Sequence, residues 1–219
     1  MPDFKINVSH RWEDSFPENG LVLSSFNADL FTDPPKQRER SDRWNMDYVW
    51  FNRFESREWI PVDPKKGEIY ELPKKLANRL FCFHMVDNVR GQTLPFAPQE
   101  LKKSQINIEI IDLHESFVKI KIFGHSVAKA KGDWLLGDND WAPDYKLDHG
   151  MKTKIIGKAT FDMKRNKFSK FEMVSIGKRY GKTEFNSRNY NTDSSYVGFL
   201  FTLSGNRVID RVAPAFVDV

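Results

Sequence analysis

Apolar side chains recur at every second position along several short segments of this chain. Successive side chains of a strand point to opposite faces of a sheet, so such alternation predicts strands with one buried and one wet face. Residues 113–116 and 164–167 separate these segments, and Asn166 suits the left-handed position of a tight turn. The pattern therefore predicts successive antiparallel hairpins. The alternating segments are 106–110, 118–122, 155–161 and 197–203.

One segment has a helical period instead. Pro73 suits the first position of a helix, and Leu76, Leu80 and Phe83 then fall on one helical face. A sheet with one apolar face must cover that face, and this helix is the obvious cover. We therefore expect an α+β, mostly antiparallel β fold: a curved sheet or open β-barrel covered by one main helix at about 73–84. Earlier strands are expected at 20–26, 46–51 and 68–72.

The length and composition of the chain favour a single folded domain. A chain of 219 residues can bury a sizeable core, and 14% aromatic residues argue against disorder. We expect N-terminal strands and a charged loop in 1–54, followed by a β-rich core with the helix in 55–215. The one cysteine, Cys82, lies in an apolar run and is interpreted as a core residue, and an internal disulfide is excluded.

Residues 177–183 approach a phosphate-binding loop without matching it. Their G-x-x-x-G-K-T pattern has three residues between the first glycine and the G-K pair, whereas a P-loop has four and leads into a helix. No apolar helical period follows. We therefore interpret the segment as a glycine-containing loop between antiparallel strands, and we expect no cofactor.

Basic and aromatic residues are interleaved between positions 164 and 188. Such a mixture suits the backbone and bases of a single-stranded nucleic acid. However, the net charge is only +4, and strand alternation places many of these lysines on a wet face by default. Weak nucleic-acid binding through the basic strands 164–188 is therefore retained only as a minor alternative.

Residues 83–92 hold the densest polar cluster beside the expected helix. His84, Asp87 and Arg90 are three positions apart, so a continuing helical turn would bring them to one face. Asp87 would then orient His84 as a general base while Arg90 holds an anion, as in a hydrolytic enzyme. In the structural alternative, Asp87 and Asn88 cap the helix and Arg90 pairs with Asp87. Since no nucleophile is evident, we favour the structural alternative and a protein that is not an enzyme.

Residues 131–150 combine acidic and aromatic side chains. Exposed aromatic residues on a loop usually pack onto something, and here they would lid a cavity in the sheet. The acidic residues lack the spacing of an EF-hand, so no metal is expected, although three aspartates are weak candidates. The expected ligand contacts are Trp134, Trp141, Tyr145, Arg179 and Tyr180, and the weak metal candidates are Asp138, Asp140 and Asp144.

The leading hypothesis is a non-enzymatic binding module. We expect it to hold a small apolar or amphipathic ligand, or a protein partner, in a sheet cavity under the 131–150 loop. Such sites are mostly apolar with a few polar anchors.

Three groups of motifs carry a resemblance to a known group of proteins. The first group is Leu72-Pro73 with "FHMVDNVRG" at 83–91. The second is "GKATFD" at 157–162, followed by Phe168, Phe171, Gly177 and "YG" at 180–181. The third is "GFLF" at 198–201 with "DRVAP" at 210–214. Over roughly residues 55–215 the chain resembles uncharacterised proteins or domains of planctomycete-type bacteria. The group has no established activity, so the resemblance implies no functional residue.

No apolar run is long enough to span a membrane, which favours a soluble protein. The first residues do not form a signal peptide. Many proteins that the chain resembles are exported, so the compartment stays open between export, with the signal removed, and the cytoplasm.

Overall fold

The strands of the computed structural model form one antiparallel sheet, in the order β2-β1-β8-β7-β6-β5-β4-β3. The structure describes residues 20–30, 44–132, 147–183, 185–188 and 193–205. The strands are β1 (Leu21–Leu30), β2 (Trp44–Phe51), β3 (Ile69–Glu71), β4 (Leu101–His114), β5 (Phe117–Gly132), β6 (Leu147–Asp162), β7 (Lys167–Gly181) and β8 (Ser195–Leu203). The helical segments are α1 (Arg53–Arg57), α2 (Lys74–Arg79), the π-helical η3 (Leu80–His84) and the 3-10 turn η4 (Pro98–Glu100). The expected mostly antiparallel fold is confirmed.

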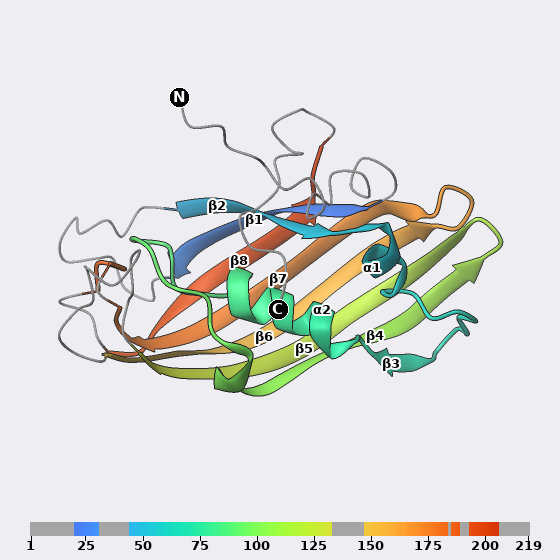
Figure 1. Cartoon of the computed structure of the whole chain (residues 1–219). Helices are drawn as coiled ribbons and strands as arrows, with labels where there is room; N and C mark the ends of the chain where they lie inside the picture. The colour runs from blue at the N-terminus through green and yellow to red at the C-terminus, as the bar shows by residue number, and fades with distance from the viewer. Residues whose placement is uncertain (1–19, 31–43, 133–146, 184, 189–192, 206–219) are drawn as a thin grey trace, which may run out of the picture.

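The sheet curves around α2, which lies on its concave face (Figure 1). In the described part of the chain, β2 and β3 form the two edges of the sheet. The sheet is therefore open and curved rather than closed into a barrel. The first strand, β1, pairs with the last strand, β8, so the N-terminal strands belong to the same sheet as the later hairpins.

The two ends of the sheet differ. The β4–β5 and β6–β7 turns lie at one end, here called the hairpin end (Figure 1). Asn166 in the second turn has a φ of 50°, which is the left-handed conformation that the sequence predicted. At the opposite end, here called the loop end, β1, β5 and β7 finish while β6 and β8 begin.

The helix expected at 73–84 forms, but it changes type halfway. α2 is followed directly by η3, in which the Met85 amide donates to the Leu80 carbonyl at 3.0 Å. A π-helical turn holds more residues than an α-helical turn, so the apolar face shifts along the sequence. Leu76 and Leu80 are fully buried as expected, whereas Phe83 is only half-buried.

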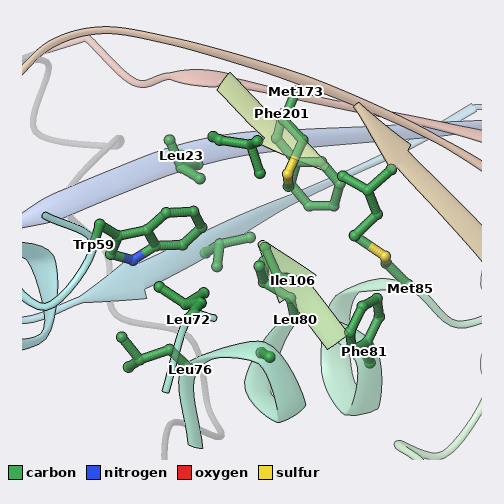
Figure 2. Close-up of a cluster of buried hydrophobic side chains, with 14 of the residues drawn as sticks. Leu23, Trp59, Leu72, Leu76, Leu80, Phe81, Met85, Ile106, Met173 and Phe201 are labelled. Carbon is green, nitrogen blue, oxygen red and sulfur yellow. The ribbon is translucent and has the colours of Figure 1, made fainter. Parts of the chain in front are cut away.

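The core fills the concave face between the sheet and α2. Figure 2 shows Trp59 among apolar side chains that come from both layers. Its ring makes edge-to-face contacts with Phe51 at 5.6 Å and with Phe171 at 5.3 Å, between ring centroids. Cys82 is also fully buried, so it is a core residue as predicted.

Two segments differ from their sequence interpretation. The glycines of the G-x-x-x-G-K-T segment were expected in a loop, but Gly177 and Gly181 both lie within β7. Pairing with β6 and β8 extends this strand well beyond its apolar alternation. The sequence of residues 98–103 also permits a short helix, but only 98–100 make a 3-10 turn, and β4 begins at Leu101 because residues from Leu101 onward pair with β5.

Candidate functional site

A network of buried charges joins two distant loops to the loop end of the sheet. Arg188 donates from Nη2 to Asp87 Oδ1 at 2.6 Å and to Asp29 Oδ1 at 2.7 Å. Arg90 Nε donates to Asp29 Oδ2 at 2.7 Å, and Arg179 Nε lies 3.2 Å from Asp87 Oδ2. We call these five residues the buried ion cluster. Arg179 and Arg188 are each only 1% exposed.

The cluster is assembled from four separate parts of the chain. Asp29 lies in β1 and Arg179 in β7, while Asp87 and Arg90 follow η3 and Arg188 follows β7. Taking charges out of water is costly unless opposite charges and hydrogen bonds replace the lost hydration. Here each guanidinium has a carboxylate within reach.

The pKa values of the two most buried arginines move in opposite directions. Burial lowers the pKa of Arg179, opposed by the charge of Asp87. Burial also acts to lower the pKa of Arg188, but the hydrogen bonds that it donates to Asp87 and Asp29, together with the charges of these carboxylates, outweigh burial, so that pKa is raised. Arginine stays charged in proteins, so the guanidinium groups are permanent charges in a cluster that fastens the fold.

The three residues considered for catalysis do not form one set. His84 Nδ1 lies 2.7 Å from Asp47 Oδ2, while Asp87 and Arg90 belong to the buried ion cluster. The helix ends at His84, so the spacing of three no longer places these side chains on a shared face. All three are buried, and Arg90 bonds to Asp29.

The residues expected to contact a ligand are also separated. Arg179 points into the concave side, within the buried ion cluster, and Tyr180 lies on the opposite face, where its ring covers Gly150. Burial and the nearby charge of Asp148 raise the pKa of Tyr180. The other expected contacts and metal candidates lie outside the described residues: Trp134, Trp141, Tyr145, Asp138, Asp140 and Asp144.

The convex face of the sheet carries apolar side chains where alternation calls for polar ones. A row of directly paired residues crosses β5, β6, β7, β8 and β1. In the middle of the row, Ile156 is 57% exposed and Val174 46% exposed. The row consists of Phe123, Ile156, Val174, Leu200 and Phe26. The apolar residues at the wet positions of β7 were the sequence signal that could have indicated this surface.

A hollow of about 630 Å³ begins at Ile156 and Val174 of this row and extends toward the loop end. Its apolar floor includes Ile176, which is 54% exposed, and the ring of Tyr196. Lys178 is part of the rim, with its Nζ 5.9 Å from the centroid of the Tyr196 ring. We call this the convex hollow, lined by His125, Ser126, Val127, Lys152, Thr153, Lys154, Ile155, Ile156, Val174, Ile176, Lys178 and Tyr196.

The charge around the convex hollow has one sign. Lys152, Lys154 and Lys178 are all exposed, and the described lining contains no aspartate or glutamate. Within the described part of the chain these lysines have no carboxylate partner. Further along the face, toward the hairpin end, Lys158 does have one, because Glu172 lies 3.3 Å from it.

Comparison with protein-family models, with curated proteins and with solved structures finds no match for this chain. Over the described ranges, no helix has the length and apolar character needed to cross a membrane. Over the same ranges, no group of three or more His, Cys, Asp or Glu side chains is arranged to hold a metal ion.

Proposed function

We propose that this protein is a non-enzymatic binding module whose convex hollow takes an anionic amphiphile, a molecule with an aliphatic chain and a negatively charged head. The observation that carries the proposal is the combination of an exposed aliphatic floor with a rim of lysines that have no carboxylate partner among the described residues. The ligand class is the one expected from the sequence. The proposed binding place differs from the expected one, because the ligand would lie on the convex face and not in a cavity under the 131–150 loop.

The floor would supply the binding energy. Ile156, Val174 and Ile176 expose about half of their surface, and an aliphatic chain laid across them would remove that surface from water. Burial contributes about 0.8 kcal/mol for each methylene group. The hollow also has the size of known small-molecule sites, which are roughly 300–1,000 Å³.

The rim would select the charge of the ligand. Lys152 pairs directly with Lys178 across β6 and β7, and Lys154 lies two positions along β6 on the same face, so a phosphate or carboxylate head can approach more than one ammonium group. At exposed sites such attraction is modest and is screened by salt. We therefore expect the lysines to decide which amphiphile binds, and the floor to decide how tightly it binds.

The core lies on the concave side of the sheet, so it limits the room there for the cavity expected from the sequence. Apolar side chains from the sheet and α2 occupy the described concave face (Figure 2). The lid assigned to that cavity, residues 133–146, lies outside the described residues. The convex hollow needs no such lid, since its floor and rim come wholly from strands that the structure describes.

Nucleic-acid binding through 164–188 has less support. Phe168 and Phe171 are buried in the core, so they have no free face on which a base could stack. Arg179 and Arg188 are engaged by carboxylates in the buried ion cluster. The enzyme alternative also has less support, because His84, Asp87 and Arg90 do not converge.

Titration of the protein with dodecyl phosphate and with the neutral dodecyl maltoside, both below their micellar concentrations, tests the proposal. We expect saturable binding of dodecyl phosphate and weaker binding of the maltoside. Ile176→Ser should weaken both ligands about tenfold, because part of the floor is lost. Lys154→Glu should weaken only the phosphate, and more at low salt than at high salt.

Two matched variants control for general effects of these substitutions. Ile69→Ser changes an isoleucine of similar exposure, 56%, on the edge strand β3. Lys74→Glu reverses an exposed charge at the start of α2. Both should bind like the wild type. Absence of saturable binding, or equal loss in the test and control variants, would show that the convex hollow is not the site.

A further inference from the structure

The apolar surface of the convex face extends beyond the hollow. Trp44 in β2 is 63% exposed, and Leu30 in β1 and Tyr196 in β8 are 44% and 43% exposed. Leu30 pairs directly with Tyr196, and its side chain lies over Gly198, where a Cβ would be 3.0 Å from Leu30 Cδ2. Trp44 pairs with Ala28, and its ring lies 6.0 Å from the ring of Phe26. These residues continue the apolar surface to the edge strand.

This surface is wider than one small ligand. It crosses β6, β7, β8, β1 and β2, and neighbouring strands lie about 4.8 Å apart, so its width is roughly 20 Å. Leu30 and Trp44 lie outside the lining of the convex hollow. A ligand that occupies the hollow therefore leaves them in water. Continuous exposed apolar surface with a polar border marks a contact with a larger partner.

We propose that the convex face docks onto the surface of an anionic lipid bilayer, with Leu30 and Trp44 inserted among the lipids and Lys152, Lys154 and Lys178 on the headgroups. This inference rests on the proposed function, because the anchors and the hollow share one face. The bilayer would then be the source of the anionic amphiphile that the hollow holds.

Charge and residue type favour a bilayer over other occupants. Lysines beside an aliphatic surface are attracted by anionic headgroups, and their methylene stems can lie along the apolar surface while the ammonium groups reach water. Tryptophan and tyrosine are the residues enriched at membrane interfaces. A second copy of this chain would place like charges opposite each other, which is unfavourable.

The backbone also permits this contact. Strands β1, β8, β7 and β6 each have a neighbour on both sides, so their amides and carbonyls are hydrogen-bonded within the sheet. A sheet face can therefore meet lipid headgroups without leaving its backbone polar groups unsatisfied. Only side chains need to enter the interface.

Co-sedimentation of the full chain with vesicles tests the inference. One set of vesicles contains phosphatidylcholine alone, and the other contains phosphatidylcholine with a minority of phosphatidylglycerol. We expect binding to the anionic vesicles only, with weaker binding at high salt. The double variant Leu30→Ser with Trp44→Ala should lower vesicle binding at least about tenfold, because two anchors are lost. It should bind dodecyl phosphate as the wild type does, since neither residue lines the hollow.

Phe54→Ala is the matched control, because Phe54 is an aromatic residue of similar exposure, 65%, on α1. It should bind vesicles normally. A thermal melt of each variant should match the wild type, so that a loss of binding is not a loss of folding. Trp44 should also show a blue-shifted fluorescence on anionic vesicles, measured as the difference between wild type and Trp44→Phe.

The results separate this inference from the proposed function. If the wild type binds dodecyl phosphate but ignores anionic vesicles, the inference is overturned and the proposed function stands. If vesicles are bound but dodecyl phosphate is not, docking of the convex face onto the bilayer stands. The convex hollow is then not a ligand site, and the proposed function is overturned. Equal vesicle binding by wild type and the double variant overturns the inference. A wild-type dimer in sedimentation that the double variant abolishes also overturns it, because the face then serves self-association.

Discussion

Arg188 donates two hydrogen bonds to Asp87, at 2.6 and 2.9 Å, across 101 positions of sequence. The two residues lie in separate segments, one after β7 and the other after η3. The Gln92 amide also donates to the Phe185 carbonyl at 3.0 Å, so the same two segments meet through their backbones. The pair therefore fastens two loops at the loop end of the sheet. Strand β7, which carries part of the convex hollow, ends there.

Replacing Arg188 by alanine should destabilise the protein strongly. Asp87 and Asp29 would lose their main partner while staying buried, and breaking a buried pair in this way costs about 3–5 kcal/mol. The free energy of unfolding in urea measures the loss. Lys119→Ala is the control, because its 2.9 Å pair with Asp112 is exposed to solvent and should contribute little to stability. Similar losses in both variants would contradict a fastening role for Arg188.

Gly181→Ala should cost more than Gly67→Ala, although both glycines have a left-handed backbone. The φ angles are 74° and 84°, so alanine is strained at either position, by roughly 1 kcal/mol. At Gly181 the added Cβ would also overlap the carbonyl oxygen of Asp148, whereas at Gly67 it meets nothing within 4 Å. Chemical denaturation of the two variants compares them directly. Equal losses of stability in the two variants would show that the ends of β7 and β6, at Gly181 and Asp148, move apart at little cost to make room for the added Cβ.

The stability of the protein should fall as the pH rises from about 9 to about 11, partly through Cys82. Burial raises the pKa of this thiol from 9.0 to about 11. The unfolded thiol therefore loses its proton first, so the unfolded state binds fewer protons in this window and stability falls with pH. The contribution is up to about 3 kcal/mol. In Cys82→Ala, unfolding free energies measured across the same window should fall less steeply, and parallel curves would refute this assignment.

Tyr70→Phe should preserve or increase stability. Burial raises the pKa of Tyr70, and within the described residues its buried hydroxyl has no hydrogen-bond partner. An unpaired buried hydroxyl costs about 1–3 kcal/mol, and phenylalanine removes it without changing the ring. Thermal melts at neutral pH compare wild type and variant. A clear loss of stability would mean that the hydroxyl has a partner in solution.

Much of the fold was predictable because strand and turn signals are local. Alternation indicated the hairpins, and the preference of asparagine for the left-handed conformation indicated the turn at Asn166. The helix was also indicated, but its π-helical half was not. Pro73, Leu76 and Leu80 favour any helix that buries one apolar stripe, whereas the change of winding at η3 depends on what the helix packs against.

The candidate site was less predictable, because its parts come from distant segments. The spacing of His84, Asp87 and Arg90 indicated a shared face only if the helix continued, and it ends at His84. Val174 and Ile176 alternate with buried residues, so their sequence shows an apolar side chain at a wet position. It does not show that Ile156 and Leu200 lie beside Val174.

The sequence by itself determined the class of fold, since the alternation of side chains along a strand is a property of the backbone. It also determined that Cys82 belongs to the core. Only the tertiary structure decided that Asp87 meets Arg188 and that apolar side chains of several strands gather on the convex face. The reason is that alternation assigns each side chain to one of two faces, while strand order and register decide which side chains become neighbours there.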